Sequence, residues 1–256
     1  MFRVRVLLFV ALALLATSCK AAVEVSIAVA ENGSGAVAVT ASFDDEARAR
    51  LGGNLAAALR TADLKASGWS VSPPQRLGNT WHVTATKPFG SPAGLQAVLD
   101  DVGGKQGVFR GWGVEVDNSF GRRTWTVQGR VVLTGSLDQF GDSDLTAALG
   151  GLPLGRTPEQ MQAELGKGGT IPLTVRVTLP ASVASAADTN GSAASYPAAS
   201  VHWRYAVPGR AVDEGLHATA SAVNAEAYLW FGLAAVALIA AVSFWIFTRS
   251  RARARR

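Results

Sequence analysis

Alternation of apolar and polar residues runs through much of the chain and predicts β-strands. In the segment AAVEVSIAVAENGSGAVAVTASF, one face of the first run carries Val23, Val25, Ile27 and Val29. The return run begins at Val37, after an Asn-Gly-Ser-Gly segment that supplies turn residues. This pattern predicts a β-hairpin near the start of the chain.

Further alternating segments predict additional strands. Residues 80–86 (TWHVTAT), 170–179 (TIPLTVRVTL) and 201–207 (VHWRYAV) each alternate over most of their length. Residues 111–135 alternate on both sides of a turn at 118–122, which predicts a second and longer hairpin. No internal repeat is evident.

Helical spacing is confined to short segments. Ser42, followed by three acidic residues, has the pattern of a helix N-cap, and leucines four residues apart carry that helix to about Ala62. Residues 91–103 predict a second helix, and 145–154 and 158–165 are further candidates. These elements predict an α+β fold, with an antiparallel or mixed β-sheet built from hairpins and a few short helices.

The longest apolar run lies near the C-terminal end. Residues 228–247 carry no charge, and at 1.5 Å rise per residue they cover the hydrocarbon core of a bilayer, which is about 30 Å thick. The basic tail at 249–256 indicates the cytoplasmic side. A buried core helix is the alternative, but such helices rarely lack polar residues on every face. We therefore expect a transmembrane helix at 227–248, with residues 20–226 outside the cytoplasmic membrane.

A shorter apolar segment at the N-terminal end has the pattern of a secretory signal peptide. Two arginines precede an apolar stretch too short to span a bilayer, and residues 1–18 lead to Cys19, the only cysteine. The run LATSC resembles a bacterial lipobox, in which the cysteine thiol carries diacylglycerol and cleavage occurs before it. The sequence predicts lipidation at Cys19. Because Ala16 stands where leucine is usual, ordinary cleavage after Ala21 or Ala22 stays open as the alternative.

The net charge of +5 is located at the two ends. Of 24 basic residues, seven arginines lie in the leader and the tail, which leaves 17 basic against 19 acidic residues. No basic face remains for nucleic acid. We expect an extracytoplasmic domain at 19–208, with a mobile Ala/Ser-rich loop at 181–200, and a juxtamembrane linker at 209–226.

The order of these segments resembles that of a known family. A lipobox-like leader, VEVSIAV, GWSV, GLPLGRTPEQMQAEL, IPLTVRVTLP and HWRYAVPG, followed by a terminal transmembrane helix, together resemble the LppM-domain lipoproteins of mycobacteria and other actinobacteria. The resemblance implies a small extracytoplasmic α/β domain linked to envelope glycolipids. It carries no catalytic residues over to this chain.

Candidates for catalysis are few. The sequence has no nucleophile elbow, zinc-protease motif, phosphate-binding loop or paired cysteines. Its histidines are His82, His202 and His217, and the first two neighbour Trp81 and Trp203 on predicted strands, so they face the opposite side. We interpret them as surface or partly buried strand residues rather than metal ligands or acid–base groups. We expect no enzyme activity, no metal and no cofactor.

Tryptophans and arginines on the long hairpin are the candidate ligand contacts. Trp112 and Trp125 are expected to lie near each other across the hairpin, either as core or lining an apolar recess for an acyl chain. Arg122 and Arg123 lie in its turn and are the preferred contacts for a phosphate head group.

Two classes of function are consistent with these patterns. The first is a membrane-anchored extracytoplasmic envelope protein that binds a lipid or glycolipid without catalysis, with phospholipid or a phosphatidylinositol-type glycolipid as ligand. The alternative is a structural or partner-binding envelope protein with no small-molecule ligand. The sequence identifies no protein partner. An enzyme is a third and weaker class.

Overall fold

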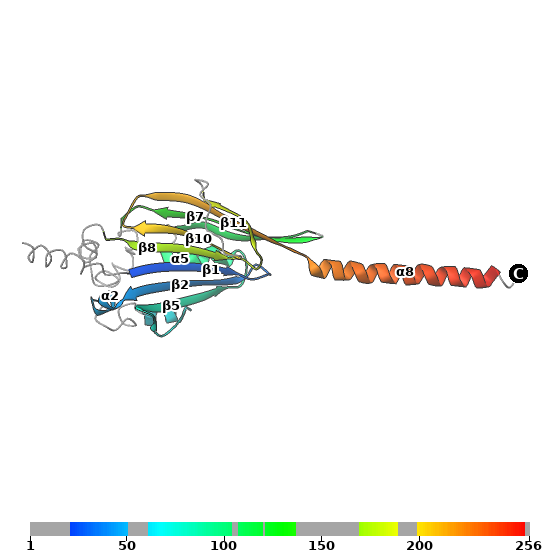
Figure 1. Ribbon diagram of the computed structural model, residues 1–256, viewed down its shortest axis with the longest axis horizontal. Coiled ribbons are helices and arrows are strands. Elements are labelled where there is room, and N and C mark those ends of the chain that lie inside the picture. The colour runs from blue at the N-terminus through cyan, green and yellow to red at the C-terminus, as the bar shows by residue number, and fades with distance from the viewer. Residues whose placement is uncertain are drawn as a thin grey trace, which may run out of the picture.

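Two β-sheets face each other, and one long helix near the C-terminus projects from one end of them (Figure 1). The computed structural model describes residues 21–50, 61–103, 107–119, 121–136, 169–188 and 199–253. Strands predominate and the other described helices are short. The predicted α+β class, with hairpins, a few short helices and one apolar C-terminal helix, is confirmed.

The larger sheet, sheet A, has the strand order β10-β8-β1-β2-β5-β3, with β4 also paired to β5. Its strands are β1 (Ala21–Val29), β2 (Gly35–Asp44), β3 (Ser70–Val71), β4 (Gln75–Leu77), β5 (Thr80–Phe89), β8 (Ile171–Thr178) and β10 (Ser200–Val207). β1 and β8 are parallel and the other pairs are antiparallel. The predicted first hairpin is confirmed as β1–β2.

The smaller sheet, sheet B, has the order β6-β7-β11-β9 and is antiparallel throughout. Its strands are β6 (Phe109–Asn118), β7 (Arg122–Leu133), β9 (Val183–Asp188) and β11 (Val212–Val223). The predicted long hairpin is confirmed as β6–β7.

Two segments predicted to be irregular contain strands. The juxtamembrane linker predicted at 209–226 is wrong, because residues 212–223 form β11 in the middle of sheet B. The mobile loop predicted at 181–200 is wrong at 183–188, which form the edge strand β9. The β-sheet domain therefore continues to Val223 rather than ending at Pro208.

Small side chains explain why these two strands were missed. The buried face of β11 consists of Leu216, Ala218 and Ala220, and β9 is an alanine- and serine-rich segment. Alanine and serine give weak hydrophobic alternation and have little intrinsic preference for strands. Backbone pairing with β7 holds β11 in place from Val212 to Val223.

The helices are α2 (Asp45–Arg50), α4 (Thr61–Ala66), α5 (Gly94–Gly103) and α8 (Ala225–Arg253). The N-cap predicted at Ser42 is wrong: the Asp44 carboxylate accepts a hydrogen bond from the backbone N–H of Ala47 at 2.7 Å. The predicted helix end near Ala62 is also wrong, because residues Thr61–Ala66 form helix α4. The helices predicted at 145–154 and 158–165 lie outside the described residues.

The core lies between the two sheets and is closed along one side by α5. This helix buries Leu95, Val98 and Leu99 against the same cluster that holds the inward faces of both sheets, as the spacing over 91–103 predicted. Sheet A contributes β-branched residues such as Ile27 and Val175, which suit a pleated, half-buried surface.

The two ends of the sandwich differ. α8 leaves β11 after a single residue, Asn224, and lies at the end toward which the β6–β7 hairpin extends (Figure 1). β1 begins at the opposite end (Figure 1). Within α8, residues Ala227–Trp245 are long and apolar enough to cross a membrane.

Candidate membrane-proximal site

The tip of the β6–β7 hairpin packs against the first turn of α8. The backbone N–H of Asn224 donates to the carbonyl of Gly121 at 3.2 Å. A Cβ on Gly121 would lie 2.9 Å from the hydroxyl oxygen of Tyr228, so the absence of a side chain permits this approach. The Asn224 side-chain oxygen accepts from the N–H of Ala227 at 3.3 Å and caps the helix.

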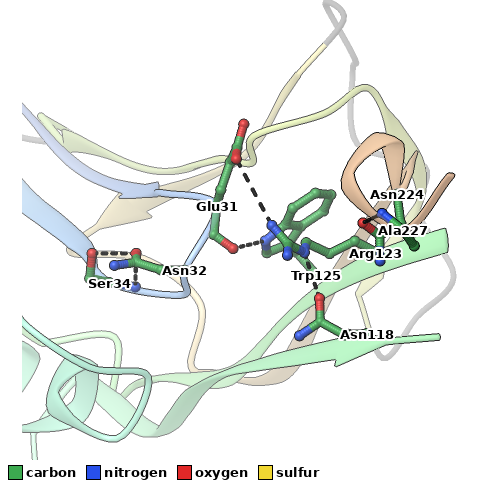
Figure 2. A network of polar contacts seen from close by, with 8 residues as sticks. All are labelled: Glu31, Asn32, Ser34, Asn118, Arg123, Trp125, Asn224 and Ala227. Carbon is green, nitrogen blue, oxygen red and sulfur yellow. Dashed lines mark hydrogen bonds and ion pairs between the residues drawn. The ribbon is translucent and has the colours of Figure 1, made fainter. Parts of the chain in front are cut away.

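The β1–β2 turn of sheet A reaches the same end of the domain (Figure 2). The indole N–H of Trp125, on β7, donates to the carbonyl of Glu31 at 2.9 Å and so joins the two sheets. The Asn32 side-chain oxygen accepts from both the backbone N–H and the hydroxyl of Ser34, at 3.1 and 2.7 Å. These bonds hold the turn in a defined position beside the hairpin.

The two arginines predicted as head-group contacts have different surroundings. Arg123 donates from Nε to Asn118 Oδ1 at 2.5 Å, and its Nη1 lies 3.9 Å from Glu31 Oε2 (Figure 2). Arg122 is exposed, and its side chain has no hydrogen bond or ion pair with the residues that the structure describes. The structure places both at the end of sheet B that leads into α8, and Arg122 is the more exposed of the two.

Trp112 and Trp125 pack in the core. Trp112 lies over Gly129, and its indole N–H donates to the carbonyl of Arg130 at 3.0 Å. Trp125 lies opposite Val116. The two tryptophans are not opposite each other across the hairpin, because Trp112 lies over Gly129, four residues or about 13 Å along the strand from Trp125.

An irregularity in β6 explains the position of Trp112. The register of β6 against β7 shifts between Arg110 and Gly113, and Gly111 adopts φ +63° there. The side chain of Gln96, on α5, accepts from the backbone N–H of Trp112 at 2.6 Å and donates to the carbonyl of Phe109 at 3.0 Å. The Gln96 side chain thereby bonds to the β6 backbone at two positions beside the irregularity.

The outer face of sheet A carries polar groups across its strands. Arg176 on β8 donates from two nitrogens to Glu24 on β1, at 3.0 and 3.1 Å. The guanidinium holds the pKa of the Glu24 carboxyl below its usual range. His82 shares a hydrogen bond with Ser42 at 2.9 Å, and His202 lies on the same outer face, as their neighbours in sequence predicted.

Between the sheets, Tyr205 on β10 donates to Glu214 on β11 at 3.2 Å. Burial, with the Glu214 carboxylate beside it, raises the pKa of the Tyr205 phenol. Nearby on the chain, the indole N–H of Trp203 is buried and has no acceptor among the described residues.

Among the described residues, no three His, Cys, Asp or Glu side chains are grouped in a way that would hold a metal ion. Cys19 lies outside the described residues. One helix in the described part of the chain, α8, passes the length and hydropathy requirements for a membrane span.

The residues that join the domain to α8 were not predicted from the sequence. Asn224 directly precedes α8 and the apolar run, which is the usual signature of an N-cap. Gly121 and Val223 carried no such signal, because their contacts depend on the pairing of β7 with β11.

These features define a β-sandwich continuous with a candidate membrane-spanning helix. No family model matches the sequence, and no curated protein matches it. Among solved structures, the folded domain of LppM from Mycobacterium tuberculosis, determined by NMR, is a neighbour with a TM-score of 0.39 and 12% sequence identity, covering 82% of this chain and 95% of that chain. At this similarity the match carries no argument about fold or function, and membership of the LppM-domain family stays a prediction.

Proposed function

We propose that this chain is a membrane-anchored envelope protein without catalytic activity, which holds its exported β-sandwich at a bilayer and binds membrane lipid. The observation that carries the proposal is the junction between domain and helix. β11 enters α8 through Asn224, and the hairpin tip at Gly121 packs against Tyr228. A domain joined this closely to a membrane span stays beside the lipid head groups.

The membrane end of the domain supports the lipid-binding part of the proposal better than the tryptophans do. Trp112 and Trp125 are 4% and 3% exposed, and both indole N–H groups are hydrogen-bonded within the protein. A ligand at either ring would have to displace filled core. Lipid contact at the exterior of the membrane end needs no such rearrangement.

Topology is the first test. We expect protease added to spheroplasts to remove the domain, and a reporter fused after Arg256 to be active only in the cytoplasm. A variant with the tail arginines replaced by glutamine is the control, since it should weaken the orientation. A reporter that is active only when exported would overturn the proposal.

Lipid binding is tested on the full chain purified in detergent. Lipids that it retains are compared by mass spectrometry with those retained by isolated α8, which controls for lipids that surround any membrane helix. Enrichment of one lipid class by the full chain supports the proposal. Identical lipid from both samples would favour the alternative, an envelope protein that binds a partner or has a structural role only.

Lipidation at Cys19 is a further part of the proposal. Cys19 precedes Ala21 by two residues, which reach about 7 Å at most. β1 starts at the end away from α8 (Figure 1), and its nine residues extend roughly 30 Å. Cys19 would therefore lie at the end of the domain opposite α8. Labelling with a clickable fatty acid should tag the wild type and not Cys19→Ala; label in both, or in neither, would overturn acylation.

A further inference from the structure

Arg122 and Val223 are directly opposed at the membrane end of sheet B. They form the last pair in the register of β7 with β11, so their side chains lie side by side on one face. Trp125 and Ala220 belong to the buried face, and alternation places Arg122 and Val223 on the outer one. Val223 is 71% exposed, which is unusual for a large aliphatic side chain at the end of a central strand.

The distance of this pair from the candidate span matches the head-group layer. Val223 precedes Ala227 by four residues, of which the last three are in α8. At 3.3 Å per extended residue and 1.5 Å per helical residue, the separation is about 10 Å or less. Head groups occupy about 5–8 Å on each side of the hydrocarbon core. An exposed valine and an exposed arginine at this level meet lipid rather than bulk water.

Arg122 is also the cation available here. Arg123 is engaged by Asn118 and Glu31, whereas the Arg122 side chain has no partner in the described part of the chain. The sequence places one acidic residue, Glu226, in the first turn of α8. An anionic lipid would therefore be attracted here by one guanidinium, that of Arg122, and not by a broad basic surface.

We propose that the paired ends of β7 and β11 form a lipid seat, defined by Arg122 and Val223, that rests in the outer head-group layer of the bilayer crossed by α8 and binds anionic phospholipid head groups. This deepens the proposed function and rests on it. The guanidinium donates to the lipid phosphate while the valine enters the boundary between head groups and acyl chains.

The absence of other cysteines in the chain allows a site-specific test. In a Cys19→Ala background, an environment-sensitive fluorophore is attached at Val223→Cys or, as the matched control, at Leu77→Cys. Leu77 is 61% exposed. It lies on β4, which pairs with β5 at Thr80–His82. These residues are at the end of sheet A where β1 begins, which is the end away from α8 (Figure 1). The full chain is placed in nanodiscs of phosphatidylcholine, or of equal phosphatidylcholine and phosphatidylglycerol, and quenched with acrylamide.

We expect the label at position 223 to be protected from acrylamide relative to that at position 77, with stronger protection in the discs that contain phosphatidylglycerol. One arginine near an anionic surface contributes roughly a fivefold change in the equilibrium between seated and free domain. Arg122→Gln should remove that lipid dependence. Arg204→Gln, which removes an exposed arginine from β10 of sheet A, should preserve it.

Two outcomes would overturn the seat. In one, positions 223 and 77 are equally accessible in both discs; in the other, Arg122→Gln and Arg204→Gln behave alike. Either result leaves the proposed function standing, provided that the protein co-migrates with the discs. Failure to co-migrate would instead show that α8 does not insert, and would overturn the proposed function itself.

Discussion

The indole ring of Trp112 on β6 lies directly over Gly129 on β7, in the space that any other residue would fill with a Cβ. The ring also donates its N–H to the carbonyl of Arg130, the next residue along. Trp112 is thereby fixed in position and orientation, and glycine at position 129 is a requirement of the packing.

Gly129→Ala is therefore expected to destabilise the domain by about 1–3 kcal/mol, because atoms added to a filled core force their neighbours to shift. The free energy of unfolding is measured by urea denaturation of the full chain in detergent. Gly113→Ala is the matched control on the neighbouring strand, since no atom lies within 4 Å of a Cβ built there. Equal losses in the two variants would contradict the packing argument.

Acid stability should depend on Glu24. Arg176 lowers the pKa of this carboxyl in the folded protein, so the stabilisation is present above the unfolded pKa, about 4.3, and is lost as the pH falls through the lower folded value. Both side chains are more than a third exposed, so we expect only about 0.5–1 kcal/mol. Glu24→Gln should flatten the fall in unfolding free energy between about pH 5 and about pH 3.

A control for Glu24→Gln is Glu31→Gln, which removes one carboxylate that is 79% exposed and 3.9 Å from Arg123. If both variants alter the acid dependence to the same degree, the effect is one of net charge and not of the pair with Arg176.

Alkaline stability should depend on Tyr205. Burial raises the pKa of this phenol above its ordinary value of 10.0, so the stabilisation is present below about pH 10 and is lost as the pH rises through the folded value. Tyr205→Phe removes the hydrogen bond to Glu214 and should cost about 1–2 kcal/mol at neutral pH. In ultraviolet absorbance titrations one phenol of the wild type should ionise late, and that phase should be absent from the variant. Its persistence would refute the assignment.

The start of α8 should depend on the side chain of Asn224. Asn224→Ala removes the acceptor for the N–H of Ala227 and should weaken the first turn by about 1 kcal/mol. Amide hydrogen exchange at Ala227 should become faster by about fivefold, which corresponds to that free energy. Asn224→Asp keeps an acceptor oxygen and should exchange like the wild type; exchange as fast as in the alanine variant would argue against capping.

Strands with branched or bulky inward residues were predictable from the sequence. β8 and β10 place such residues at every second position, and β1 does so over most of its length, as in Val25 and Ile27. Burial of one face requires that period, so the pattern is visible without the fold. β11 was not predictable, because Ala218 and Ala220 are buried by the proximity of its neighbours and not by their own hydrophobicity.

The candidate ligand contacts also divide into features that the sequence predicted and features that only the fold decided. The sequence brought Arg122 and Arg123 to the tip of one hairpin, since a hairpin is local, but their predicted place in the turn is wrong, because both belong to strand β7. The contact between Arg123 and Glu31 was not readable from the sequence, because Glu31 comes from the distant β1–β2 turn. The tryptophans show the converse error: their positions on the hairpin were correct, but a bulge at Gly111 and the glycine at 129 decide where Trp112 packs.

The sequence by itself determined the apolar span at α8, the first hairpin, the long hairpin and the strand-rich class, because each depends on residues close together in the chain. Only the tertiary structure decided that β11 enters α8 through Asn224 and that Arg122 lies beside Val223 at that junction. Arg122 and Val223 are about 100 residues apart in the chain. Backbone hydrogen bonds between β7 and β11 bring them together, and such bonds leave no mark of the partner strand in the sequence.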